Sequence, residues 1–289
     1  MGVKNNDSIL SKRLEVINSI PTLPEVVERL TVLLQNPKTS AEEVGRAITA
    51  DQALSSKVLK LVNSAFYGFP GRIGSINHAV VILGFATVKN IVLTASILQC
   101  FKIPEKKEGG FSPEQFWLHS ISCGAAAKCI ARHIGFSNSE ECFTAGLIHD
   151  IGKIILHQYL PENFQQIIDL VNQTDKLFYD CERELFDFTH QDIGGELADR
   201  WKLPSHLRDA IALHHNPFID QQNFSVTAVV HCADIFVRAL NYGSGADRKI
   251  PPMNESVWRN LGLENTSLTS LFDSIGKEIR KASVFVQAV

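Results

Sequence analysis

Apolar residues recur with helical spacing along almost the whole chain, and this pattern limits the fold more than any other feature. In residues 22–36 and 51–68 they follow one another at intervals of three or four, which places them on one face of an α-helix. We find no convincing alternation of apolar and polar residues of the kind typical of half-buried strands. The sequence therefore predicts an all-α fold.

Several segments carry signals for the start of a helix. Thr22-Leu-Pro-Glu25 and Ser40-Ala-Glu-Glu43 have the pattern of capping boxes, and Ser112 precedes a proline with Gln115 three residues on. Further helices are expected over about 113–134, 139–158, 161–174, 178–199, 204–214, 224–241 and 266–284.

The length of 289 residues suits two helical lobes better than one core. The segment PEKKEGGFS combines a proline, two glycines and a cluster of charges between apolar helices. We therefore expect an N-terminal lobe over 1–104, a linker over 105–111, and a C-terminal lobe over 112–289. The second lobe should be a helical bundle with a C-terminal helical extension.

Composition excludes several classes of protein. The chain is 45% hydrophobic and 20% charged, with a net charge of −3, so nucleic acid is not an expected partner. The N-terminus has no apolar signal segment, and no apolar run reaches the length of about 18 residues needed to cross a membrane. The six cysteines form no CxxC pair and are expected to be buried, reduced thiols. We expect a cytoplasmic protein without a membrane partner.

The segment AGLIHDIGK places His149 and Asp150 in an apolar helix, with Lys153 four residues after the histidine. Such side chains are costly to bury unless they have partners, and a divalent cation is a natural partner for histidine and aspartate. The alternatives are a kink in a core helix for the His-Asp pair and a structural salt bridge for Lys153.

Further candidate ligands lie on other predicted helices: His119, His190, His214, His215 and Asp234. Asp234 is a lone carboxylate on an apolar helix, so it needs a partner. Convergence of these side chains on one cavity would supply that partner. His214 and His215 could instead interact with the dipole at a helix C-terminus. His231, three residues before Asp234, suits either ligation or a hydrogen bond that orients a ligand.

The order of these residues resembles the HD superfamily of metal-dependent phosphohydrolases, and more specifically the HDOD family, which is known from bacterial signalling proteins. The segments IPTLPEVVERL, ITADQALSSKVLKLVNSAFYG and IGSINHAVVILGFATVKNIV resemble the HDOD pattern. The resemblance covers roughly Ile20 to His215 and extends to Asp234 through the superfamily motif.

The resemblance implies roles for the candidate residues. The ligands of a mononuclear HD site match His119, His149, Asp150 and Asp234. The additional ligands of binuclear relatives match His190, His214 and His215, with Asp150 bridging the ions. Lys153 matches a lysine that faces substrate phosphate, so Lys153 and Asp150 are the candidate catalytic residues. Imidazole and carboxylate ligands suit one or two ions of Fe or Mn, with Zn or Ni as alternatives.

Two departures from the pattern bear on activity. The HD-GYP relatives have a Gly-Tyr-Pro signature after the paired histidines, where this chain has Asn216-Pro217. Gln115 stands where binuclear enzymes place a glutamate. Three hypotheses remain open. The first is a metal-binding signalling module that acts on protein partners, with a nucleotide or other phosphorylated compound as a further candidate ligand. The second is a phosphohydrolase or phosphodiesterase acting on a nucleotide or cyclic dinucleotide. The third is a metal-free interaction scaffold.

Overall fold

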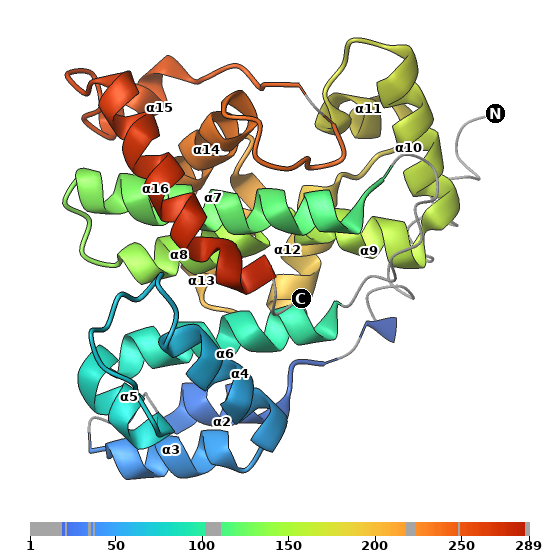
Figure 1. The fold of residues 1–289 in the computed structure, drawn as a ribbon. Coiled ribbons are helices and arrows are strands. Elements are labelled where there is room, and N and C mark those ends of the chain that lie inside the picture. Colours follow the sequence, from blue (N-terminus) through green and yellow to red (C-terminus); the bar gives the residue numbers. More distant parts are fainter. Residues whose placement is uncertain are drawn as a thin grey trace. The chain divides into compact units, whose positions relative to one another are not determined.

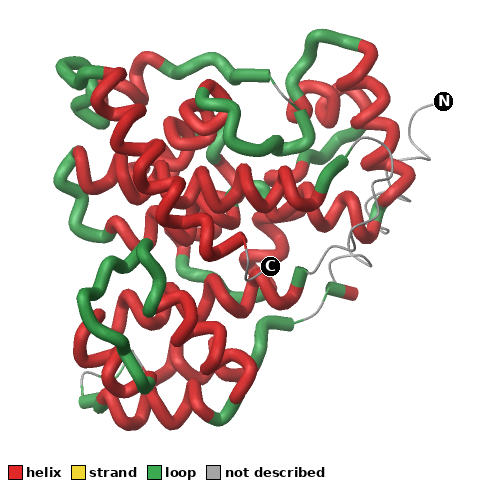
Figure 2. The backbone as a smooth tube through the Cα atoms, viewed as in Figure 1, coloured by secondary structure: helices red, strands yellow, loops and turns green. Residues whose placement is uncertain are grey.

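The computed structural model describes residues 19–20, 22–33, 36, 38–101, 111–217, 224–247 and 249–286. Every regular element in these residues is a helix (Figure 2), so the predicted all-α fold is confirmed. The chain divides into two compact units, which are described separately. The smaller unit contains residues 22–101 and 277–286, and the larger unit contains 111–276.

The smaller unit is built on five short helices and the end of a sixth: α2 (Glu25–Leu33), α3 (Ala41–Thr49), α4 (Gln52–Val62), α5 (Ile76–Leu83), α6 (Phe85–Cys100) and the C-terminal half of α16 (Leu268–Val286). The capping box predicted at Ser40 and Glu43 is confirmed at the start of α3. Within this unit α3 packs on α5 and α4 on α6. The ring of Phe285, from α16, lies 5.3 Å from that of Phe66.

The larger unit contains α7 (Pro113–His133), α8 (Ser139–Ile148), α9 (Ile151–Tyr159), α10 (Pro161–Gln173), α11 (Phe178–Leu185), α12 (His190–Arg200), α13 (Ser205–Leu213), α14 (Phe224–Ala239), α15 (Glu255–Asn260) and the first turns of α16. Helix α7 packs against both α8 and α14 (Figure 1). Two glycines let α7 and α8 approach closely. A Cβ added to Gly124 would lie 2.7 Å from the carbonyl oxygen of Phe143. A Cβ added to Gly146 would lie 2.7 Å from the carbonyl oxygen of Cys123.

Two of the predicted helices are each broken into two, and both breaks lie beside candidate ligands. The helix expected over 139–158 is interrupted at His149 and Asp150, which form the junction between α8 and α9. The helix expected over 178–199 is two helices, and the second begins at His190. Apolar periodicity continues through both breaks, so it gave no sign of them.

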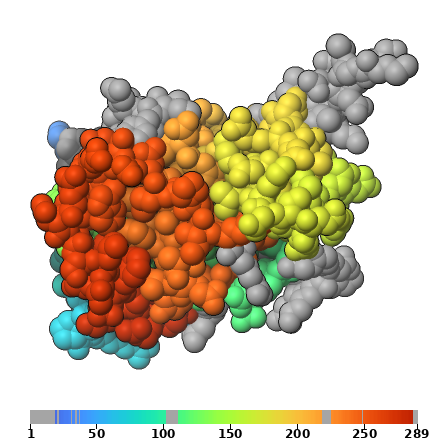
Figure 3. Space-filling view, turned by 90° about the horizontal axis from the view of Figure 1, so that it is seen from above, coloured from blue at the N-terminus to red at the C-terminus, as the bar shows by residue number. Residues whose placement is uncertain are grey.

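A long connection after α14 adjoins the segment before α11 on the surface of the larger unit. The Lys249 ammonium donates to the carbonyl oxygens of Thr174 and Lys176, and the Phe178 amide donates to Asp247. Figure 3 shows these segments, orange and yellow, next to each other on one face. The contacts hold Asp247 and Lys249 against the segment that leads into α11.

The units differ from the expected lobes at the C-terminus, because residues 277–286 group with the N-terminal helices. The expected linker, 105–111, lies outside the described residues except Phe111, which is buried. Helix α2 begins at Glu25, three residues after the Thr22 predicted to cap it. No helix among the described residues has both the length and the apolar character that a membrane span requires.

The packing of α9 on α12 should be intolerant of any side chain at Gly152. A Cβ there would lie 1.9 Å from the carbonyl oxygen of His190, which is backbone and cannot rotate away. We predict that Gly152→Ala lowers the free energy of unfolding by about 1–3 kcal/mol, the usual cost of overpacking. Urea unfolding measures this. Gly71→Ala is the control, since a Cβ at Gly71 meets no atom within 4 Å. Equal stability of the two variants would contradict the prediction.

Candidate metal centre

The larger unit brings all seven predicted ligands into one buried cluster. Their potential ligand atoms fall into overlapping groups, each within 4.8 Å: His119, His149 and Asp234 with Cys123; His190, His214 and His215; and His149, Asp150 and His214. Six of the seven side chains are buried, and His215 is half-buried. Helices far apart in the sequence therefore supply one centre.

The first group lies where α7, the end of α8 and α14 meet. The His119 Nε2 is 3.1 Å from Asp234 Oδ1, and the His149 Nε2 is 3.8 Å from the same oxygen. The Arg238 guanidinium, one turn after Asp234 on α14, donates to this oxygen at 2.8 Å and also to Asp247. Burial opposes ionisation, but Arg238 and His119 hold the pKa of Asp234 well below its usual range. The aspartate is therefore a carboxylate at neutral pH.

Asp150 lies between the two ends of the cluster. One carboxylate oxygen, Oδ1, is 3.3 Å from His190 Nε2 and 3.5 Å from His214 Nε2, and these two nitrogens are 3.4 Å apart. The other oxygen, Oδ2, is 3.4 Å from His149 Nε2. One carboxylate thus faces histidines of both groups.

The Lys153 ammonium makes a buried ion pair with Asp150 Oδ2 at 2.8 Å and donates to the Gly245 carbonyl oxygen at 2.9 Å. Burial alone would raise the pKa of Asp150, but Lys153 and His149 hold it well below its usual range. The ion pair was the alternative interpretation of Lys153 from the sequence. Its contact with a phosphate stays a prediction.

Hydrogen bonds at Nδ1 fix the rings of the histidines. The Nδ1 of His149 donates to the Gly146 carbonyl oxygen at 2.7 Å, and that of His214 donates to the Ile211 carbonyl oxygen at 3.0 Å. Because a neutral imidazole carries one proton, Nε2 of both rings is left with a lone pair. The Nε2 of His149 is buried without a hydrogen-bond partner among the described residues. This arrangement is typical of histidines that bind metal.

Glu182 is a buried member of the centre that sequence analysis missed. Its carboxylate accepts from the His190 backbone amide at 2.8 Å and from the His190 Nδ1 at 2.6 Å. Burial opposes the charge of His190, but Glu182 outweighs this effect and raises the pKa of that histidine. Glu182 lies in an ordinary charged run, YDCERE, so no local signal distinguished it. His231, which was considered from the sequence, donates from Nδ1 to the His214 carbonyl oxygen at 2.8 Å.

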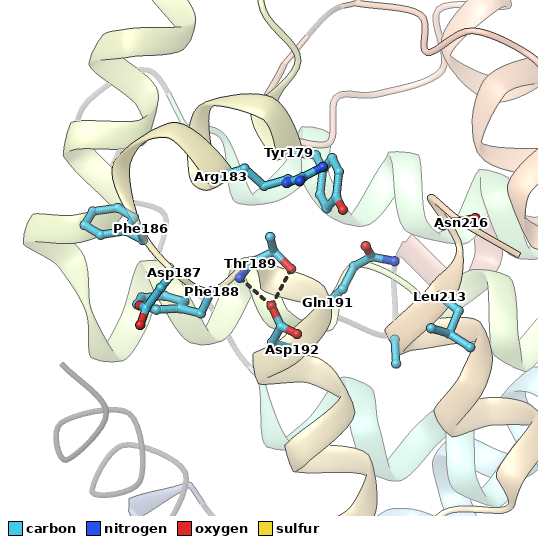
Figure 4. Close-up of a pocket in the computed structure, with 11 residues that line it drawn as sticks. Tyr179, Arg183, Phe186, Asp187, Phe188, Thr189, Gln191, Asp192, Leu213 and Asn216 are labelled. Carbon is cyan, nitrogen blue, oxygen red and sulfur yellow. Dashed lines mark hydrogen bonds between the residues drawn. The ribbon is translucent and has the colours of Figure 1, made fainter. Parts of the chain in front are cut away.

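A cavity of about 570 Å³ is lined by residues of α11, α12 and the end of α13 (Figure 4). Tyr179 and Arg183 of α11 line one side, and Gln191 of α12 lies across from them. The Tyr179 ring is 4.6 Å from that of His215, so the cavity adjoins the ligand cluster. Gln191 is 6% exposed, and its Nε2 has no partner among the described residues.

The donor set fits a divalent ion. It offers the Nε2 lone pairs of His149 and His214 beside ionised carboxylates, and imidazole and carboxylate are ligands that Fe, Mn, Zn and Ni accept. The orphaned His149 Nε2 and Asp150 Oδ1 would gain a partner. Fold and site together define an all-helical protein with a buried His/Asp cluster able to bind metal.

Comparison with known proteins gives the family. The model of the HDOD domain family matches residues 20–217, and the chain belongs to this family. Asp234, Arg238 and Asp247 lie beyond the matched residues. An uncharacterized protein of Treponema pallidum (strain Nichols) is 25% identical over 227 residues, which cover 78% of this chain and 43% of that protein. The chain therefore spans less than half the length of this relative.

Solved structures show the same fold. An HDOD domain protein of unknown function from Geobacter sulfurreducens is 27% identical with a TM-score of 0.73, and the match covers 98% of this chain and 97% of that one. A protein from Shewanella amazonensis SB2B, described as a "putative phosphohydrolase", is 22% identical with a TM-score of 0.74 and coverages of 96% and 97%. A "putative signal transduction protein" from Marinobacter aquaeolei VT8 is 20% identical, with a TM-score of 0.72 and coverages of 99% and 67%.

The buried histidines should make the metal-free protein sensitive to acid. Burial lowers the pKa of His149 to about 3, whereas an unfolded histidine titrates near about 6.5. Below that pH the unfolded chain binds a proton that the native chain does not. The free energy of unfolding therefore decreases as the pH is lowered. His149 alone should account for a loss of about 2 kcal/mol between about pH 7 and pH 5.

Urea unfolding of the metal-free protein at the two pH values measures this loss. His149→Gln should show a smaller pH dependence than the wild type, because one titrating group has been removed. The control is His133→Gln, since His133 is exposed. The same pH dependence in the His149 variant and the wild type would contradict the assignment.

Proposed function

We propose that this chain is a bacterial signal-transduction module of the HDOD type that binds divalent metal in its His/Asp centre. The observation that carries the proposal is the fixed orientation of the histidines. Backbone carbonyls and a carboxylate hold Nδ1 of His149, His190 and His214. The Nε2 atoms therefore face Asp150 before any ion binds.

The chain's own residues would divide the work of holding an ion. His119, His149 and Asp234 would hold it at one end, and His190, His214 and His215 at the other. Asp150 has an oxygen close to each end. Glu182 keeps the His190 ring in place and favours its proton on Nδ1, and Arg238 keeps Asp234 ionised. A bound divalent ion would supply a Lewis acid beside the cavity.

A regulatory role is favoured over hydrolysis by what the chain lacks. Asn216-Pro217 follows the paired histidines where the HD-GYP relatives have Gly-Tyr-Pro, and Lys153 is committed to Asp150 and Gly245. The partners of such a module would be proteins of a signalling pathway.

A second candidate function, phosphohydrolase or phosphodiesterase, is favoured by the cavity beside His215. Arg183 is an exposed cation on its wall, Tyr179 offers an aromatic face, and the Gln191 amide nitrogen has no partner in the part of the chain that the structure describes. These groups suit a nucleotide or another phosphorylated ligand. In that case Lys153 would have to leave Asp150 to contact phosphate.

Metal content tests the leading proposal. Protein purified without a His-tag or chelator should carry one or two equivalents of a divalent transition metal per chain by mass spectrometry. Asp150→Ala should lower that content by at least one equivalent, since this carboxylate faces both groups. It should also reduce the gain in melting temperature caused by metal.

The control is His206→Ala, because His206 lies outside the three ligand groups. It should keep full metal content. A wild-type protein that binds no metal even after soaking would overturn the proposal and leave an interaction scaffold.

Turnover separates the two candidate functions. With metal bound, the regulatory proposal predicts that hydrolysis of a chromogenic phosphodiester stays at the level of the metal-free protein. Turnover that depends on metal would support the phosphodiesterase instead. In that case Arg183→Ala should weaken turnover mainly by raising KM. Lys176→Ala is the matched control, because Lys176 is exposed and does not line the cavity.

A further inference from the structure

Cys123 lies in the metal centre, although no part of the sequence pattern assigns it there. It follows His119 by four residues on α7, so both side chains leave the helix on the same face. The thiol is completely buried, and its Sγ is 3.5 Å from His119 Nε2. From the sequence we expected only an inert core cysteine.

The spacing of these atoms is that of ligands around one ion. The Sγ of Cys123, the ring nitrogens of His119 and His149 and an oxygen of Asp234 all lie within 4.8 Å of one another. For a tetrahedral ion with metal–nitrogen and metal–sulfur bonds of about 2.0 and 2.3 Å, the two ligand atoms are about 3.5 Å apart. The separation from His119 Nε2 matches this value.

Asp150 is the ligand that Cys123 would replace at this end. Its Oδ2, the oxygen nearer His149, is already paired with the Lys153 ammonium at 2.8 Å. The other oxygen faces His190 and His214. Oδ2 also lies 3.8 Å from His119 Nε2, so Asp150 and Cys123 compete for the fourth position at this end. The thiol takes that position where Lys153 keeps its hold on the carboxylate.

We propose that Cys123 is a metal ligand, which together with His119, His149 and Asp234 forms a closed four-ligand site of the kind that binds zinc. This inference rests on the proposed metal-binding function and names the ligand set and metal preference of one end of the centre. A thiolate is a soft ligand and selects zinc or cobalt over manganese. At this end the preference therefore moves away from the Fe or Mn expected from the family resemblance.

The proton balance is simple. The neutral thiol loses its proton to solvent and the sulfur lone pair forms the bond to the ion, so each ion bound at this site releases one proton. No change of oxidation state is involved. Burial and the carboxylates of Asp234 and Asp150 raise the pKa of the Cys123 thiol well above its usual range, so the thiol keeps its proton until an ion binds.

Cobalt(II) spectroscopy of the full chain tests the proposal. Metal-free wild-type protein titrated with cobalt should develop a thiolate-to-cobalt charge-transfer band in the near ultraviolet. Cys123→Ser should lose the band. Its ratio of zinc affinity to manganese affinity should be lower than that of the wild type by a factor of at least about ten. The matched control is Cys142→Ser, since Cys142 is equally buried, lies on α8 and belongs to none of the ligand groups. It should keep the band.

A second measurement needs no variant and guards against misfolding of the serine protein. X-ray absorption of the zinc-loaded wild type should show one sulfur neighbour at about 2.3 Å. Bound zinc with only nitrogen and oxygen neighbours, or a cobalt band that survives in Cys123→Ser, would overturn the role of Cys123 and leave the metal-binding function intact. A wild type that binds neither ion would overturn both.

Discussion

The carboxylate of Asp150, buried among histidines, is the constraint on which the larger unit depends. An isolated charge in such a place would cost several kcal/mol in lost hydration. The structure offsets this cost with the Lys153 ammonium on one oxygen and ring nitrogens near both. The carboxylate stays ionised as a result. The neighbouring groups are therefore positioned around a negative charge that a divalent cation would compensate more fully.

Close backbone packing makes this cluster geometrically stable. Gly124 and Gly146 bring α7 against α8, and Gly152 brings α9 against the start of α12. A side chain at any of these glycines would separate helices that carry His119, His149 or His190. Since ligand atoms must meet within a few tenths of an ångström to share an ion, the glycines belong to the site as much as to the core.

The sequence was sufficient for the all-α fold, because apolar periodicity reports local structure directly. It also identified seven side chains that the structure brings together. The expected helix ranges ran across the breaks at His149 and before His190, because apolar residues continue across both junctions; a kink at the His-Asp pair was only one of the alternatives. Glu182 and Cys123 were missed for another reason. Each has an ordinary local setting. The approach of α11 to α12 gives Glu182 its partner His190, and only the packing of α8 and α14 on α7 brings His149 and Asp234 near Cys123.

The two ends of the centre differ in their access to solvent, and this difference suggests a division of roles. His119, Cys123, His149 and Asp234 are all buried, which is typical of closed sites that hold an ion for structural reasons. His215 at the other end is half-buried and touches Tyr179 on the cavity wall. A ligand entering the cavity would meet this end first. We therefore expect an ion at the closed end to stabilise the fold and one at the open end to respond to ligands. A signalling module could use such an arrangement without any hydrolysis.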